Sequence, residues 1–277
     1  MDAELIVALA DAEQESSFGG KAVSLAAAIR AGLPVPGGAA LAAQFVDQVA
    51  AGVPAAIERL LSSPYVPSSR LAVRSSAIGE DSAGASFAGQ HLTRLNVRTP
   101  QLLDAVRDVW QSGRTESALA YRRRKGLPGE PRIGVVVQRL VDPLAAGVLF
   151  TRHPVTGADE RLIEAAWGLG EAVVNGTVIP DRITLDATGR VLEAVVGDKD
   201  VKIWYGDSDG TVEQPVEAAL RHAMCMTDAQ LAALHDLGER CRRIWGSNLD
   251  IEWALDADGA VHLLQCRPIT TLSPSQA

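Results

Sequence analysis

The sequence contains few cysteines, and their positions match no known site. Only three occur in 277 residues, at Cys225, Cys241 and Cys266. An odd number excludes a complete disulfide framework, and the spacing fits no zinc motif. The sequence therefore predicts free thiols, buried or partly buried, in a reducing cytoplasm.

Long apolar segments are also missing. The acidic start MDAE is followed by an apolar run of only six residues, Leu5 to Ala10. That run is too short and wrongly flanked for a signal peptide. No other apolar run approaches the roughly 20 residues that a membrane-spanning helix needs. We therefore expect a cytoplasmic protein that does not bind a membrane.

Positive charge is scarcer than negative charge. The chain has 26 lysines and arginines against 34 aspartates and glutamates, which gives a net charge of −8. An acidic protein of this kind is not expected to bind nucleic acid or an anionic membrane surface in general. An anionic ligand would have to be bound by lysine and arginine side chains gathered at one place.

Several common catalytic and cofactor motifs are absent. The sequence has no Gly-x-Ser-x-Gly, and no two of its five histidines have the helical spacing of a metal site. Gly19-Gly20-Lys21 is not a Walker A loop, because Glu15 stands at the first glycine position. Trp167-Gly-Leu-Gly170 lacks the third glycine of a dinucleotide fingerprint, because Val173 takes its place. Serine hydrolases, zinc enzymes and Rossmann proteins thus lack support.

Apolar residues make up 47% of the chain, enough for a substantial core in one large domain or two lobes. Helical patterns dominate the first half and strand patterns the second, so the sequence predicts an α+β fold. The expected helices are 22–31, 42–61 (weakened by Gly52 and Pro54), 100–112, 116–125, 215–224 and 228–245. The expected strands are 71–76, 91–97, 133–140, 145–151, 161–166, 182–185, 191–195 and 201–205.

The segment from Asp250 to Thr270 is predicted to form a β-hairpin around the turn Asp256-Ala-Asp-Gly259. Residues two apart in a strand lie on the same face of it. Asp250 and Glu252 therefore share one face of the first strand, and Gln265 and Arg267 share one face of the second. Closing the hairpin brings two carboxylates, an amide oxygen and a guanidinium together. These groups suit Mg²⁺ and phosphate, although a surface hairpin with an ordinary cross-strand ion pair has the same pattern.

Two basic residues of the first half could bind phosphate. Lys21 stands at the start of a helix, where backbone N–H groups and the helix dipole favour anions. Arg74 lies in a strand that leads into the glycine-containing loop 77–90. The alternatives left open are a plain loop-to-helix turn for Lys21 and, for Arg74, an ion pair with Glu80 or Asp81.

Together these segments resemble the ATP-binding domain of the phosphoenolpyruvate synthase and pyruvate phosphate dikinase family, which includes rifampin phosphotransferase. Five segments match in family order: GGKAVSLAAAIRAGLPVPGG (19–38), LAVRSSAIGEDSAGASFAGQHLTRLNV (71–97), AGVLFTRHPVTG (146–157), IEAAWGLGEAVVNGTVIPDR (163–182) and LDIEWALDADGAVHLLQCRPIT (249–270). The resemblance implies an ATP-grasp fold that holds nucleotide between two lobes. We place these lobes at residues 1–135 and 136–271, with a tail at 272–277.

The resemblance also implies roles for single residues. It assigns phosphate binding and catalysis to three basic residues (Lys21, Arg74 and Arg267) and a loop closing over the phosphates to the segment containing Ser86, Gly89 and Gln90. Adenine binding falls on Gln138, Arg139 and Leu140. Glu252 and Gln265 match the Mg²⁺ ligands, and Asp250 matches a nearby acidic residue. The implied cofactors are therefore ATP and Mg²⁺.

In the family, the β,γ-pyrophosphoryl group of ATP passes to a histidine on a separate domain, and AMP is left. No Thr-x-His carrier motif follows Arg267-Pro-Ile-Thr270, and Thr151-Arg-His153 lies inside a matching ATP-binding segment. We therefore expect a phosphotransferase component that needs a carrier-histidine domain on another chain. The alternatives are a non-catalytic nucleotide-binding module and an ATP-grasp enzyme that acts directly on a small molecule.

Overall fold

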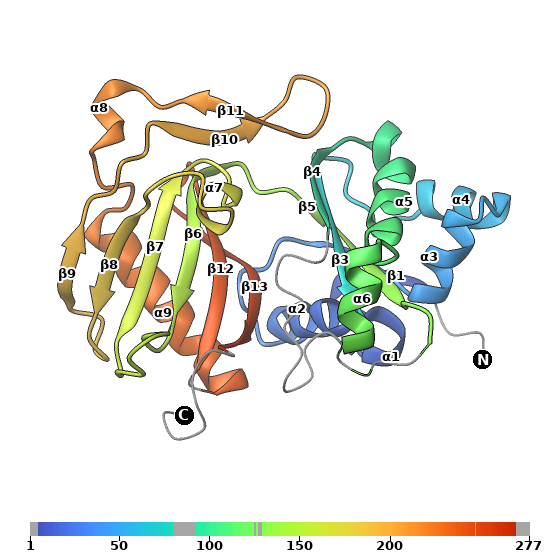
Figure 1. The fold of residues 1–277 in the computed structure, drawn as a ribbon, viewed down its shortest axis with the longest axis horizontal. Helices are drawn as coiled ribbons and strands as arrows, with labels where there is room; N and C mark the ends of the chain where they lie inside the picture. Colours follow the sequence, from blue (N-terminus) through green and yellow to red (C-terminus); the bar gives the residue numbers. More distant parts are fainter. Residues whose placement is uncertain (1–4, 80–91, 125, 127–128, 247, 270–277) are drawn as a thin grey trace. The chain divides into compact units, whose positions relative to one another are not determined.

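The computed structural model describes residues 5–79, 92–124, 126, 129–246 and 248–269. Helices and strands both contribute extensively, which confirms the predicted α+β class (Figure 1). The chain divides into two compact units. The first comprises Met1–Ala31, Pro36–Leu140 and Gly206–Gly210, and the second comprises Gly32–Val35, Val141–Tyr205 and Thr211–Ala277. The boundary predicted at residues 135–136 falls inside the strand Ile133–Arg139.

The first unit is built on a five-stranded antiparallel sheet in the order β1-β2-β5-β3-β4. Its central strands β3 and β5 are almost entirely buried, and the buried residues of β3 include the polar Arg74, Ser75 and Ser76. The sequence did not predict β1 and β2, because three or four small apolar residues carry no clear period. The strand bounds are β1 Ile6–Ala8, β2 Gly38–Leu41, β3 Leu71–Ala77, β4 Thr93–Val97 and β5 Ile133–Arg139.

Helices pack against this sheet through their apolar stripes. The single helix expected at 42–61 is two helices, because Gly52 takes a positive φ of 79° and Pro54 begins the second. Helix α5 packs on β3 and also against α3. The helices are α1 Glu15–Phe18, α2 Gly20–Arg30, α3 Ala43–Ala50, α4 Pro54–Leu61, α5 Leu102–Ser112 and α6 Glu116–Arg124, with single 3₁₀ turns at η1 Leu9–Asp11 and η2 Thr99–Gln101.

The second unit is built on a six-stranded antiparallel sheet in the order β13-β12-β6-β7-β8-β9. Trp253 and Leu149 are fully buried in this unit. The predicted hairpin is confirmed as the pair β12–β13. The strand bounds are β6 Pro143–Phe150, β7 Arg161–Trp167, β8 Asp181–Leu185, β9 Val191–Val195, β12 Leu249–Asp256 and β13 Val261–Pro268.

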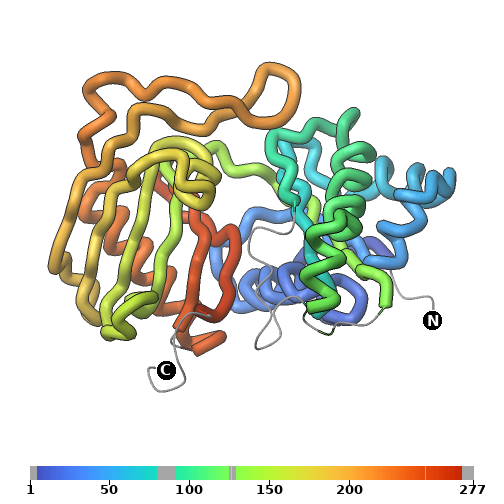
Figure 2. Tube along the Cα trace, viewed as in Figure 1, coloured from blue at the N-terminus to red at the C-terminus, as the bar shows by residue number. Residues whose placement is uncertain are grey.

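The long helix α9, Asp228–Trp245, packs on the hairpin strands of this sheet (Figures 1 and 2). It begins with a capping box, because the Thr227 hydroxyl accepts the Gln230 N–H and the Gln230 side chain accepts the Thr227 N–H. Gly246 ends it with a φ of 103°. Within the helix, Gly238 allows close approach, since a Cβ there would lie 2.8 Å from a methyl group of Leu149.

The helix predicted at 215–224 is wrong. Residues Thr211–Pro215 form strand β11, which pairs with β10, Val201–Tyr205. Only one helical turn, α8 Ala218–Arg221, remains of the prediction. The predicted helix overlaps β11 only at Pro215, so strand β11 was missed and the helix was predicted too long at both ends. A further short helix, α7 Glu171–Val174, follows β7.

Among the described helices, none combines the length and the apolar character needed to cross a membrane.

Candidate functional site

The hairpin β12–β13 brings four of the predicted site residues together. Asp250 lies directly opposite Arg267, and Glu252 lies directly opposite Gln265. Both pairs project from the same face of the sheet, since the residues are two apart in each strand. Ile251 and Cys266, which lie between them in sequence, are buried on the opposite side. The structure therefore places the predicted metal ligands and the predicted phosphate-binding arginine in one patch.

Asp250 and Arg267 form a close ion pair within that patch. The Arg267 Nε and one terminal nitrogen donate to Oδ2 of Asp250 at 2.9 and 2.8 Å. The second oxygen, Oδ1, is buried and has no hydrogen-bond partner among the described residues. Burial raises the pKa of Asp250, the charge of Arg267 opposes this, and the charge of Glu252 adds to it. A cation near Oδ1 would relieve the cost of that buried, half-satisfied carboxylate.

We tested whether these residues fit Mg²⁺, which the resemblance implies. Among the described residues, no three His, Cys, Asp or Glu side chains form a metal-binding group by themselves. Mg²⁺ needs only one or two protein carboxylates, because water and substrate phosphates complete its coordination. Glu252, the amide of Gln265 and the unpartnered Oδ1 of Asp250 are hard oxygen donors of that kind. The donor set therefore fits Mg²⁺ bound together with a nucleotide.

In the first unit, Lys21 and Arg74 lie on neighbouring elements. Helix α2 starts against β3, because the Ala22 N–H donates to the Ser76 hydroxyl at 3.0 Å. Gly19 permits this contact, since a Cβ there would lie 2.0 Å from the Ser76 carbonyl oxygen. Arg74 is two residues from Ser76 in β3 and is buried. The alternative partners Glu80 and Asp81 lie outside the described residues.

The predicted adenine-binding residues end strand β5. The Gln138 side chain is buried and donates to the Pro36 carbonyl at 2.8 Å. The N–H groups of Arg139 and Leu140 donate to the carbonyls of Gly37 and Arg70, both at 2.9 Å. Adenine binding through these two N–H groups would require those bonds to be replaced, so this role stays a prediction. Ser86, Gly89 and Gln90 of the predicted phosphate loop lie outside the described residues.

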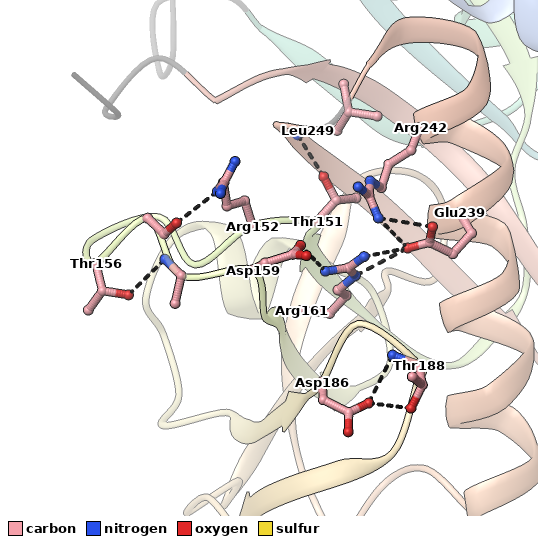
Figure 3. A network of polar contacts seen from close by, with 12 residues as sticks. Thr151, Arg152, Thr156, Asp159, Arg161, Asp186, Thr188, Glu239, Arg242 and Leu249 are labelled. Carbon is pink, nitrogen blue, oxygen red and sulfur yellow. Dashed lines mark hydrogen bonds and ion pairs between the residues drawn. The ribbon is translucent and has the colours of Figure 1, made fainter. Parts of the chain in front are cut away.

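A polar network between the start of β7 and helix α9 was not predicted from sequence (Figure 3). Arg161 has a side chain that is only 2% exposed, and it donates to Asp159 at 2.6 Å and to Glu239 at 2.8 Å. Glu239 also accepts from Arg242 at 2.9 Å. Arg161 and Glu239 are 78 positions apart, and no local pattern in the sequence signals such a contact. The network fixes the start of β7 to α9.

Comparison with known proteins identifies the family. The model of the pyruvate phosphate dikinase AMP/ATP-binding domain matches residues 39–277. The chain belongs to this family. The family model matches most of the chain and includes the hairpin β12–β13 with its four site residues.

Two relatives illustrate the range of the pyruvate phosphate dikinase family. A probable phosphoenolpyruvate synthase of Methanothermobacter thermautotrophicus is 47% identical over 206 residues, covering 73% of this chain and 30% of the relative. A rifampicin phosphotransferase of a Streptomyces species is 44% identical over 232 residues, covering 82% of this chain and 26% of the relative. The chain thus spans less than a third of either relative, and both relatives contain a large additional part.

Solved structures that match the chain include the D-Ala:D-Ser ligase VanG from Enterococcus faecalis. It is 11% identical, covers 90% of this chain and 52% of the ligase, and gives a TM-score of 0.42. The family assignment rests on the family model and the sequence relatives.

Proposed function

We propose that the chain is the ATP-grasp module of a dikinase-type phosphotransferase. In this proposal it binds Mg–ATP and transfers the β,γ-pyrophosphoryl group to a histidine on a separate domain or chain, and AMP is released. The observation that carries the proposal is the direct opposition of Glu252 and Gln265 beside the Asp250–Arg267 pair. Membership of an AMP/ATP-binding domain family supports the nucleotide.

The roles of the residues follow from their charges. Glu252 and Gln265 would hold Mg²⁺, and the buried Oδ1 of Asp250 would face the same cation. Mg²⁺ would neutralise negative charge on the phosphates. Arg267 is already oriented by Asp250, so its planar guanidinium is held in place before a phosphate arrives. Lys21 and Arg74 would supply further positive charge from the first unit.

The acceptor is proposed to be a histidine on another domain. Both relatives contain a part, more than two thirds of their length, that this chain does not match. Phosphoryl transfer requires positioning and charge neutralisation more than covalent chemistry by the binding module. A module that binds and activates ATP can therefore serve an acceptor carried elsewhere.

Calorimetric titration of Glu252→Ala tests the site. We expect the variant to lose at least about 10–100-fold in affinity for Mg–ATP, because a direct ligand should matter no less than an outer-shell group. Titration without Mg²⁺ should show little difference between the variant and the wild type. Glu193→Ala is the matched control, because Glu193 lies on the exposed strand β9 of the same unit. Equal Mg–ATP affinity of the wild type and Glu252→Ala would contradict the assignment.

A further inference from the structure

The loop after β6 forms a compact turn held by its own hydrogen bonds. His153 N–H donates to the Ala158 carbonyl at 3.1 Å, and Gly157 N–H donates to the His153 carbonyl at 2.9 Å. Nε of Arg152 donates to the Gly157 carbonyl at 2.7 Å. Gly157 has a φ of 71°, a conformation that favours glycine. The side chains of Arg152 and His153 are therefore presented from a loop of fixed shape.

His153 carries a defined tautomer in this loop. Its Nδ1 accepts hydrogen bonds from the backbone N–H groups of Val155 and Thr156 at 3.3 and 3.2 Å. A nitrogen that accepts two N–H groups carries no proton, so the neutral ring is protonated at Nε2. That Nε2–H donor has no hydrogen-bond partner among the described residues. It is a donor held in place by the loop.

The guanidinium of Arg152 carries a positive charge and forms no ion pair with a carboxylate of the described residues. Asp159 is bonded to Arg161, and Glu239 is bonded to Arg161 and Arg242 (Figure 3). Both nearby carboxylates are thus already bonded to other arginines, and Arg152 acts on Asp159 through its charge. The terminal nitrogens of Arg152 make no hydrogen bond within the part of the chain that the structure describes. In Figure 3 the Arg152 side chain projects from the loop on the side away from α9.

The loop lies at the same end of the sheet as the Asp250–Arg267 pair. Phe150, the last residue of β6, is directly opposite Asp250, and Val148 is opposite Glu252. Thr151 continues this alignment, since its N–H donates to the Leu249 carbonyl at 2.9 Å. Strand β6 ends at Phe150, and Thr151 and Arg152 form a bend, so the loop starts one residue beyond the pair Phe150–Asp250. Arg152 therefore follows the end of β6 at which β12 carries Asp250.

We infer that Arg152 and His153 form a second anion subsite, at the outer end of the phosphate-binding patch. It takes a phosphate-like dianion through the terminal nitrogens of Arg152 and the Nε2–H of His153. The inference rests on the proposed function, which places ATP phosphates at Arg267. Two sources share this chemistry: the terminal phosphate of the nucleotide, and free phosphate that enters beside it.

The test measures binding to the isolated chain by calorimetry, with three variants. Arg152→Gln removes the charge and the bond to Gly157. Arg152→Lys removes that bond but keeps the charge, so it separates loop shape from anion binding. Arg190→Gln is the control, because Arg190 is 76% exposed in the same unit and pairs with Asp186. Thermal melts of all variants check that the fold is retained.

Two titrations distinguish the sources. If the subsite holds the terminal phosphate, Arg152→Gln lowers the affinity for Mg–ATP about tenfold or more and leaves Mg–AMP unchanged. If it holds free phosphate, Arg152→Gln leaves both nucleotides unchanged and removes the binding of inorganic phosphate to the Mg–AMP-loaded protein. In either case Arg152→Lys retains most of the binding. Equal binding by wild type and Arg152→Gln in both titrations overturns the subsite, as does equal loss in the glutamine and lysine variants.

An NMR measurement keeps this test separate from the proposed function. Inorganic phosphate added to the nucleotide-free protein should shift the Nε2 signal of His153 in the wild type and not in Arg152→Gln. If the wild type binds no nucleotide but shows that shift, the proposed function fails and the subsite stands. If it binds Mg–ATP and neither the shift nor the Arg152 dependence is seen, the subsite fails and the function stands.

Discussion

Replacing Asp181 by leucine should destabilise the second unit strongly, because Asp181 is the hub of a buried polar cluster. Its side chain and that of Lys199 are both fully buried, and they form an ion pair. Asp181 also accepts the N–H of Gly197 at 2.9 Å and both the N–H and the thiol of Cys225 at 2.9 and 3.0 Å. Burial raises the pKa of Cys225, so its sulfur stays protonated and donates.

The magnitude follows from what each variant leaves behind. Asp181→Leu strands a buried ammonium whose remaining partner is the Gly197 carbonyl at 3.5 Å. Breaking a buried pair in this way costs about 3–5 kcal/mol. Lys199→Met leaves the carboxylate with three donors, so we expect a smaller loss of about 2 kcal/mol. The double variant buries no unpaired charge and should be more stable than Asp181→Leu alone.

Urea denaturation followed by circular dichroism measures these free energies of unfolding. The expected order of stability is wild type, Lys199→Met, double variant, Asp181→Leu. The decisive comparison is between the stability of the double variant and that of Asp181→Leu. The double variant lacks the unpaired Lys199 ammonium that Asp181→Leu leaves buried, so it should be the more stable of the two. Two results would refute the reasoning: equal losses for the two single variants, or a double-variant loss equal to their sum.

Two further predictions concern single residues. The hydrogen bond from Arg161 lowers the pKa of Asp159 from its ordinary value of 3.8. The ionised Asp159 therefore stabilises the fold fully at pH values above its unfolded pKa. This stabilisation is lost as the pH falls through the lower pKa of the folded state. In acid titrations, Asp159→Asn should therefore flatten the pH dependence of unfolding below about pH 4. In urea denaturation, Gly19→Ala should lower the free energy of unfolding by about 1–3 kcal/mol more than Gly52→Ala does. Both glycines have a positive φ, but only at Gly19 would an added Cβ collide with the Ser76 carbonyl. Equal losses in the two variants would count against that contact.

The sequence predicted the hairpin well because its signals are local. Alternation over Asp250–Leu255 and turn residues at Asp256–Gly259 fix which side chains share a face. The same reasoning brought Asp250 and Glu252 close to Gln265 and Arg267, and the structure adds that Asp250 lies directly opposite Arg267. It did not predict the irregularity between Glu252 and Trp253, where the pairing shifts. Such a shift depends on packing against neighbouring strands, which alternation does not encode.

Contacts between distant segments could not be predicted. Arg161 and Glu239 meet because β7 and α9 pack together, and the bond from Thr211 to Glu171 joins segments 40 positions apart. Strand β11 at 211–215 was not predicted either, since a five-residue strand that pairs with β10 has only a weak local signal. Likewise, Asp181 and Lys199 showed no sequence signal as a buried pair, since each reads alone as a surface charge.

The identity of the nucleotide product tests the central claim most directly. Mg–ATP labelled at the α-phosphate would be incubated with the chain alone and with the remaining part of the Streptomyces relative, which is 44% identical over the matched region. We predict little AMP from the chain alone, and AMP without ADP once the partner is added. In parallel reactions with ATP labelled at the β- or γ-phosphate, the label should move to the partner. Formation of ADP, or efficient phosphorylation of the isolated chain, would contradict the account.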